Sequence, residues 1–191
     1  WSMPVQEYLP RFEMHSAFAS EEMTAVDLLT HQSGLPRHDL LWYGEDFSRQ
    51  ELFARLRHLE PSASFRSTFQ YQNLMYMTAG YLAGQLTDSS WEDQVRQRLL
   101  QPLGMSTSTL SVETMQQASN YARPYGGGKD SLTTLDFRNI DAVGPAGSIN
   151  SSAAEMLPWV QLFLNEGRHG DTRVIESSTV DQLIQPRVVV D

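Results

Sequence analysis

Apolar residues recur at three- and four-residue intervals in several stretches of this chain. Such intervals place side chains on one face of a helix, and they predict helices within residues 52–59, 74–86, 95–99 and 156–164. The faces are formed by Leu52, Leu56 and Leu59; by Met77, Tyr81 and Leu82; by Val95 and Leu99; and by Met156, Trp159, Val160, Phe163 and Leu164. We expect each face to pack against the core.

Five positions combine a hydroxyl residue with an acidic residue three places later. This is the spacing of a capping box, or of its aspartate variant, at the start of a helix. The pairs are Thr24 with Asp27, Ser48 with Glu51, Ser90 with Asp93, Ser152 with Glu155, and Ser178 with Asp181. At least five helices are therefore predicted.

Strand signals are sparse by comparison. Only short segments, residues 172–175 and 188–190, have strand composition. Residues 121–140 contain Pro124 and three consecutive glycines at 126–128, so they are predicted to form an exposed loop rather than a linker between domains. The predicted fold class is mainly α, with few short strands.

Length and charge narrow the range of functions. A chain of 191 residues with 40% hydrophobic residues is typical of one globular domain or a compact piece of one. The formal net charge is −9 and the arginines are scattered, so we predict no nucleic acid partner. The chain has no cysteine, its five histidines are not spaced as a ligand set, and residues 123–130 fail the P-loop pattern. Neither a metal nor another cofactor is predicted.

The two ends of the chain look like cuts. The first residues, Trp1 to Pro4, lack the basic flank and apolar stretch of a signal peptide, and no apolar run reaches the roughly 20 residues needed to span a bilayer. The start at Trp1 without a methionine, and the apolar end at residues 188–190, lead us to expect an internal piece of a longer polypeptide.

Three motifs follow one another along the chain. DLLTHQSGLP occupies residues 27–36, Tyr-Gln-Asn occupies residues 71–73, and Pro-Ala-Gly-Ser occupies residues 145–148, ahead of Met156; QPLGM at residues 101–105 lies between them. In order and spacing these motifs resemble the serine hydrolases of the class C β-lactamase and penicillin-binding-protein-like family. The resemblance covers nearly the whole chain.

The resemblance implies a fold and an activity. In this family a helical domain is inserted into an antiparallel sheet backed by helices, so residues 1–191 are expected to form a single, partial β-lactamase-related domain whose sheet is incomplete. The implied reaction cleaves amide or ester bonds of small molecules or peptides through an acyl-enzyme, without a cofactor, as in β-lactamases, D-amino-acid peptidases and esterases. The implied location is the periplasm or the outside of the cell.

The tyrosine motif carries the implied chemistry. Acyl transfer through a serine needs a base that takes the hydroxyl proton and later activates water, and in this family a tyrosine serves. A phenol with a pKa near 10 is a poor base at neutral pH unless cations favour its ionised form. The resemblance makes Tyr71 the catalytic tyrosine. It makes Asn73 a polar partner for a substrate amide or for the catalytic lysine.

A structural role is the alternative for this triplet. On its own, Tyr71 fits a half-buried aromatic residue, and Asn73 fits the N-cap of the helix that follows. The flanking motifs favour an inherited catalytic site over that interpretation.

Two histidines near the first motif are predicted to differ in role. Residues 30–36 are typical of a turn after a helix, so His31 is predicted to be a hydrogen-bonded core histidine. The resemblance places His38 at the mouth of the cleft, where we expect it to touch the substrate.

The third motif has two open interpretations. The resemblance places Pro145, Ala146 and Gly147 in one wall of the cleft, where small side chains leave space for an acyl group. A tight turn before the helix that begins near Ser152 explains the same residues equally well.

The family's nucleophile is missing from this chain. It belongs to a Ser-x-x-Lys motif, but Lys129 is the only lysine here and Gly126 stands three residues before it. The third family motif, Lys-Thr-Gly or His-x-Gly, is also absent, since His169-Gly170 lacks the pattern. Tyr71 therefore has no serine to deprotonate and no predicted cation beside it, and the isolated chain is expected to be inactive.

A second hypothesis belongs to another class of function. The chain can be a non-catalytic helical module derived from the family, which binds a partner or forms a homodimer through exposed apolar surface. A Ser-x-x-Lys motif in the flanking coding sequence would favour the enzyme, and its absence would favour the module.

Overall fold

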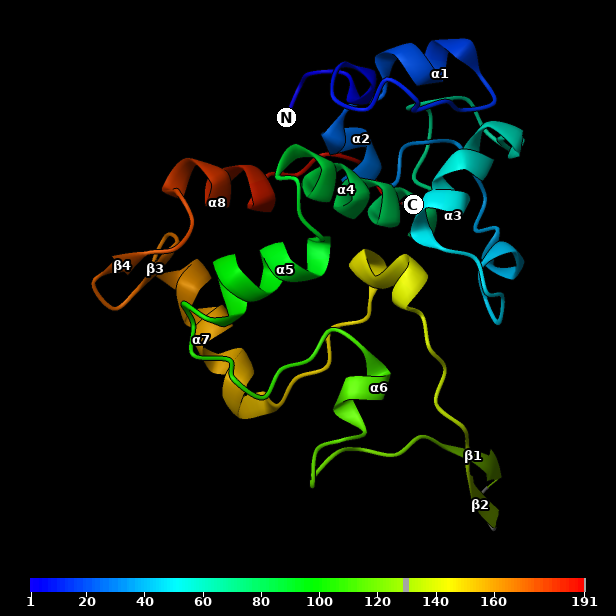
Figure 1. Ribbon diagram of the computed structural model, residues 1–191. Helices are drawn as coiled ribbons and strands as arrows, with labels where there is room; N and C mark the ends of the chain where they lie inside the picture. The colour runs from blue at the N-terminus through cyan, green and yellow to red at the C-terminus, as the bar shows by residue number, and fades with distance from the viewer. Residues whose placement is uncertain (129–130, 191) are drawn as a thin grey trace.

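The computed structural model describes residues 1–128 and 131–190. Lys129 lies outside this part, and the absence of a Ser-x-x-Lys motif follows from the sequence. The described residues are mainly helical, as predicted, with two small antiparallel hairpins (Figure 1). Among them no helix is both long enough and apolar enough to cross a membrane.

The elements follow one another in a fixed order along the chain. The α-helices are α1 (Ala17–Glu22), α2 (Ala25–Leu29), α3 (Arg49–Arg55), α4 (Asn73–Leu86), α5 (Trp91–Val95), α6 (Val112–Met115), α7 (Ala153–Leu164) and α8 (Ser177–Ile184). Shorter helical turns are η1 (Val5–Glu7), η2 (Asp39–Leu41), η3 (Leu56–His58), η4 (Arg96–Leu100, a π-helix) and η5 (Asp141–Ala146). The strands are β1 (Tyr125–Gly128), β2 (Ser131–Thr134), β3 (Arg168–His169) and β4 (Thr172–Arg173).

Local capping explains where most of these helices begin. Hydroxyl side chains accept the backbone N–H three residues on at the starts of α2, α3, α5 and α7, through Thr24, Ser48, Ser90 and Ser152. The fifth predicted start, at Ser178, is wrong. Helix α8 begins at Ser177, so Ser178 already lies inside it, and the preceding Glu176 makes no side-chain capping bond.

Helix α4 is the helix around which the other elements pack. It contacts α2, α3, α5 and η5 (Figure 1). A Cβ atom added to Gly80 would lie 2.1 Å from Cγ of Pro145, so the glycine is what lets η5 approach α4 this closely. The helix predicted for residues 74–86 is confirmed, and it begins one residue earlier.

Two hydrophobic clusters form among the described residues. The α4 cluster consists of Val5, Leu9, Phe12, Met14, Ala19, Met23, Leu28, Leu35, Leu52, Phe53, Leu56, Leu74, Met75, Met77, Leu82 and Val143. The α7 cluster consists of Val95, Leu100, Leu103, Met105, Leu110 and Leu162.

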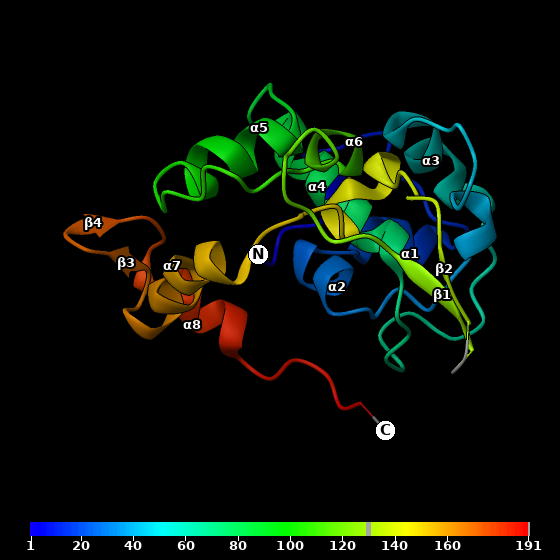
Figure 2. The same ribbon diagram turned by 90° about the horizontal axis from the view of Figure 1, so that it is seen from below.

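The two hairpins lie far apart at opposite edges of the molecule (Figure 2). The predicted loop at residues 121–140 is exposed, but it contains the β1–β2 hairpin, in which Gly127 has φ 128° and a Cβ there would lie 1.9 Å from the Ser131 carbonyl oxygen. The predicted strand at 172–175 is reduced to β4, which pairs with β3. The predicted strand at 188–190 is wrong, because these residues pair with no strand of the described part.

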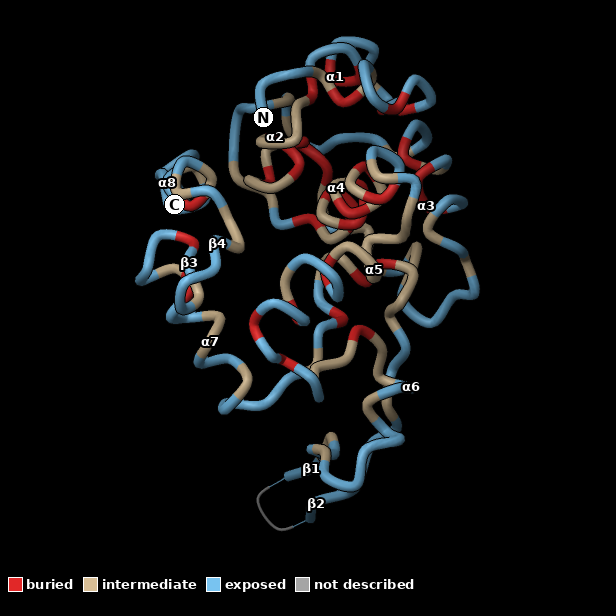
Figure 3. The backbone as a smooth tube through the Cα atoms, turned by 60° about the vertical axis from the view of Figure 1, so that its left-hand side comes forward, coloured by how far each residue is buried: buried red, intermediate tan, exposed pale blue. Residues whose placement is uncertain are grey.

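The prediction for the outward face of α7 is also wrong. Met156, Val160 and Leu164 were expected to face the core, yet they are 37%, 51% and 77% exposed, and Leu162 is the fully buried residue. The helix is apolar on nearly all sides, so spacing alone does not distinguish the face that packs. Figure 3 shows the buried positions concentrated around α4, whereas α7 is mostly exposed or intermediate.

Candidate functional site

Gln72 joins the tyrosine motif to the first motif. Its side chain is fully buried, and it caps α4 by accepting the backbone N–H of Leu74 at 2.9 Å. Its amide nitrogen donates to the Pro36 carbonyl, and its backbone N–H donates to Nδ1 of His31 at 3.1 Å. Gln72 therefore joins residues 31–36 to the start of α4, through both its buried side chain and its backbone N–H.

His31 has the structural role that was predicted for it. It is 9% exposed, and its ring lies 5.3 Å from that of Phe69 and 5.0 Å from that of Tyr76, measured between ring centroids. Nδ1 accepts a hydrogen bond from Gln72, so this nitrogen carries no proton. Burial lowers the pKa of His31, which favours the neutral ring.

Tyr71 contacts its described neighbours through its ring and not through its hydroxyl. The ring centroid lies 4.7 Å from that of His31, and the guanidinium carbon of Arg37 lies 5.0 Å from it. Tyr71 is 44% exposed, and its hydroxyl makes no hydrogen bond to any described residue. The expectation of no neighbouring cation is corrected here, because Arg37 stacks against the ring.

Tyr76 offers a direct comparison on the other side of His31. Its ring stacks on the histidine, but its hydroxyl donates to the Leu29 carbonyl at 2.9 Å. Burial raises the pKa of Tyr76. Of the two tyrosines that flank His31, Tyr71 is the one whose phenol is available to another molecule.

Asn73 contacts the loop that follows the first motif. It is the first residue of α4 and not its N-cap, which corrects the structural alternative considered for it. Its Nδ2 lies 3.5 Å from Oδ1 of Asp39, whose Oδ2 accepts from Nε of Arg37 at 2.7 Å. Arg37, Asp39, Tyr71 and Asn73 thus form one polar group, and sequence reasoning assigned no role to the first two.

His38 lies within this same loop, in a left-handed backbone conformation with φ 49°. Its Nε2 is buried and has no hydrogen-bond partner among the described residues. The contacts of Arg37 with Tyr71 and of Asp39 with Asn73 place His38 beside the predicted catalytic pair. Its contact with a substrate stays a prediction.

The third motif packs farther along α4. Pro145 and Ala146 end η5, and Pro145 rests on Gly80, seven residues or roughly 10 Å from the start of the helix. Gly147 follows with φ 173° and ψ 22°, which is neither helical nor extended, and it is exposed. Among described residues, no hydrogen bond joins this segment to Tyr71, so the structure places the two parts of the predicted site on one helix without direct polar contact.

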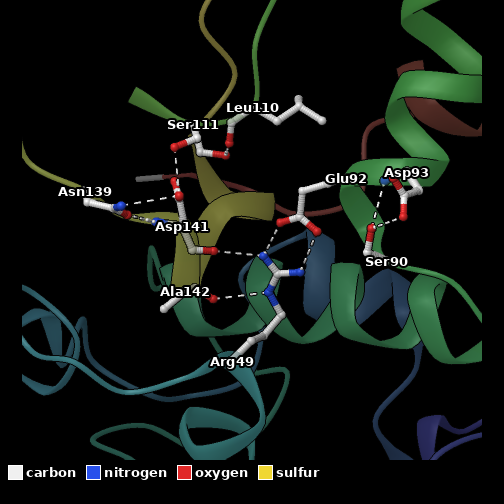
Figure 4. A network of polar contacts seen from close by, with 10 residues as sticks. Arg49, Ser90, Glu92, Asp93, Leu110, Ser111, Asn139, Asp141 and Ala142 are labelled. Carbon is white, nitrogen blue, oxygen red and sulfur yellow. Dashed lines mark hydrogen bonds and ion pairs between the residues drawn. The ribbon is translucent and has the colours of Figure 1, made fainter. Parts of the chain in front are cut away.

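A network around Arg49 anchors η5 and its neighbours (Figure 4). Nη2 of Arg49 lies 2.6 Å from Oε1 of Glu92 and donates to the Asp141 carbonyl at 2.8 Å, and Nε donates to the Ala142 carbonyl at 3.2 Å. Arg49 is only 16% exposed at its side chain. The network joins α3, α5 and η5, and it holds the segment that leads to Pro145.

Comparisons with known proteins identify the family of this chain. The β-lactamase family model matches residues 1–189. An unguisins hydrolase of Aspergillus campestris is 28% identical over 173 residues, which are 86% of this chain and 32% of that protein.

Two solved structures share the fold. The octameric penicillin-binding protein homologue from Pyrococcus abyssi superposes with a TM-score of 0.76 at 21% identity, over 95% of this chain and 42% of that one. A D-stereospecific amidohydrolase from Streptomyces superposes with a TM-score of 0.75 at 18% identity, over 96% of this chain and 57% of that one.

The chain belongs to the β-lactamase family, a family of serine hydrolases. The chain spans about a third of the length of the first two curated relatives that it matches. The described residues accordingly form part of a β-lactamase-like fold, with helices predominant and little sheet.

Proposed function

We propose that this chain supplies the tyrosine and the asparagine of the active site of a serine hydrolase that cleaves amide or ester bonds through an acyl-enzyme. The observation that carries the proposal concerns Tyr71, whose ring contacts both His31 and Arg37 while the residue remains 44% exposed. Residues 1–191 would be one partial domain of that enzyme.

In the proposed reaction the Tyr71 oxygen accepts the proton of a serine hydroxyl as the serine attacks the carbonyl carbon. The same proton then passes to the leaving nitrogen or oxygen. During deacylation Tyr71 accepts a proton from the attacking water and returns it to the serine oxygen as the acyl bond breaks. Asn73 donates from Nδ2 to the substrate or accepts at Oδ1 from the catalytic lysine, and its present neighbour Asp39 holds that amide in place. The serine and the lysine would come from polypeptide outside these 191 residues.

Covalent labelling tests the proposal. We expect a fluorophosphonate probe to leave the mass of this 191-residue chain unchanged, and to add one adduct to a longer form of the protein that contains a Ser-x-x-Lys motif. Absence of an adduct on the longer form would reject the hydrolase.

The two tyrosines beside His31 provide a matched pair for the longer form. Tyr71→Phe should lower turnover at least ~100-fold, because it removes the proton acceptor. Tyr76→Phe removes a hydroxyl that donates to Leu29, so it should cost about 1 kcal/mol of stability and leave turnover within a few-fold. Near-normal turnover in the Tyr71 variant would remove it from the mechanism.

A homodimer is a second candidate, supported by the exposed apolar face of α7. Ala153, Leu157, Val160 and Leu164 are spaced by four, three and four residues, and Leu157, Val160 and Leu164 are at least half exposed. Two antiparallel copies of the helix would place Leu157 against Val160 and Ala153 against Leu164. A second copy of this chain is therefore the partner that this face fits.

Light scattering after size-exclusion chromatography tests the dimer. We expect the wild-type chain to elute as a dimer at high concentration, and Leu157→Asp to elute as a monomer. A concentrated wild-type sample that remains monomeric would contradict this candidate, whereas Leu40→Asp, at an 88% exposed residue outside α7, is the control.

A further inference from the structure

A pocket of about 770 Å³ is lined by two segments that neighbour predicted substrate-binding residues along the chain. One wall is formed by residues 42–48, which follow His38, and another by residues 137–143, which precede Pro145. The backbone N–H groups of Trp42 and Tyr43 donate to the Asp39 carbonyl at 3.2 and 2.9 Å. This turn therefore links Asp39, which contacts Asn73, to the first residues of the pocket wall.

Carboxylates dominate the charge of this pocket. Glu45, Asp46, Glu113 and Asp141 line it together with Arg138, and the guanidinium of Arg55 lies against the lining Phe47. Glu45 and Asp46 are exposed and form no ion pair within the described residues. Such a surplus of negative charge attracts a cation and repels an anionic ligand.

Aromatic side chains line the same pocket. Tyr43 already holds the Arg138 guanidinium carbon 4.4 Å from its ring centroid, and Phe47 holds that of Arg55 at 3.9 Å. The walls therefore already present ring faces to cations. Trp42, whose indole is the best aromatic acceptor for a cation, holds none of the described cations.

One lining residue also carries a polar acceptor without a partner. Oδ1 of Asp141 is buried and has no hydrogen-bond partner in the described part of the chain. The other oxygen of Asp141 accepts from Ser111 at 2.8 Å and from Asn139 at 3.3 Å (Figure 4). A carboxylate that is only half satisfied is stabilised by a nearby positive charge.

We infer that this pocket binds an ammonium or guanidinium group on the side chain of the substrate. The inference rests on the proposed hydrolase function and gives it a substrate class, amides or esters with a cationic side chain. Carboxylates and aromatic faces provide the attraction, and the turn at Asp39 connects the pocket to Asn73.

A binding experiment on the 191-residue chain tests the inference without turnover. The probes are Nα-acetyl-lysine amide and its neutral counterpart Nα-acetyl-norleucine amide, followed through the indole N–H signal of Trp42 in nitrogen-15 NMR, which Trp42→Phe assigns. We expect the lysine probe to bind about tenfold more tightly at low salt, from one cation–π contact and two exposed carboxylates. Equal affinities would overturn the inference.

Charge variants separate a local effect from the net charge of the molecule. The double variant Glu45→Gln/Asp46→Asn should reduce the preference from about tenfold to about threefold or less. Glu21→Gln/Glu22→Gln, which neutralises an adjacent exposed pair on α1, removes the same charge and should keep the full preference. An equal loss in both variants would overturn the inference.

The outcomes for the pocket and for the hydrolase are distinguishable. A lysine preference in this chain, together with a longer form that takes no acyl label, supports the cation site and rejects the hydrolase. A labelled longer form, together with equal binding of the two probes, keeps the hydrolase and overturns the cation site.

Discussion

The α4 cluster and the α7 cluster differ in how many buried residues they contain. The first contains 16 buried residues and packs α2, α3, α4 and η5 together, whereas the second contains six, of which only Leu162 lies on α7, with the partly buried Trp159 packed against it. The first motif and the tyrosine motif belong to the α4 region. The outer face of α7 is exposed, so this helix has one packed side and one open side.

The candidate site is therefore supported by the region with the larger buried cluster, which we expect to be the more stable one. Tyr71 and Asn73 stand at the start of α4, next to the buried Gln72 and Leu74. Local opening of a protein begins where apolar contacts are few. We therefore expect α7 to open without disturbing the tyrosine motif, and four variants test this separation.

The largest effect is expected for Leu74→Ala in the α4 cluster. Leu74 is fully buried, so the truncation leaves a cavity and should lower the free energy of unfolding by about 2–5 kcal/mol. Urea unfolding followed by circular dichroism measures the change. Leu86→Ala, on the same helix at a residue that is 56% exposed, should change it by less than about 0.5 kcal/mol.

Leu162→Ala makes the same truncation in the α7 cluster. We expect a loss of about 2–3 kcal/mol, because a small cluster can partly collapse around the missing atoms. Hydrogen exchange read by mass spectrometry should show faster exchange in α7 and little change in α4. Equal acceleration in both helices would show that the two clusters unfold as one unit.

Gly80→Ala tests the contact between α4 and η5. A Cβ at this position would meet Pro145 at 2.1 Å, so η5 must shift and the stability should fall by about 1–3 kcal/mol. Gly147→Ala is the matched control in the next segment, since its Cβ would meet nothing closer than 4.0 Å. A thermal shift assay compares them, and equal shifts would refute the close packing.

The smallest effect concerns pH and Asp27. Burial alone would raise the pKa of Asp27, but hydrogen bonds from Arg66 and Thr24 outweigh it and hold the pKa below its ordinary value. The carboxylate therefore stabilises the fold above pH ~4, and this contribution is lost as pH falls through the lower folded pKa.

Asp27→Asn should accordingly cost about 1–2 kcal/mol at neutral pH and make unfolding less sensitive to acid between pH ~4 and ~2. Urea unfolding at several pH values measures both effects. Glu60→Gln, at an exposed residue, should keep the wild-type pH dependence. An unchanged acid response in the Asp27 variant would show that its pair with Arg66 is not coupled to folding.

Several features could be predicted from the sequence because they depend on neighbours along the chain. Thr24 and Ser48 cap helices by accepting the backbone N–H of the residue three places later. The spacing of apolar residues within 74–86 predicts the extent of α4. The motifs at residues 27–36, 71–73 and 145–148 are also local patterns, and they predict the family whose model matches the chain. The absence of Ser-x-x-Lys follows from the one lysine of the chain.

Other features were decided only by the tertiary structure. Arg37 reaches Tyr71 across 34 positions, and Arg49 reaches Glu92 across 43, so no local pattern announces either contact. The exposed side of α7 could not be predicted either. An apolar helix has no polar face to mark it, and only the position of the neighbouring elements decides which side is covered.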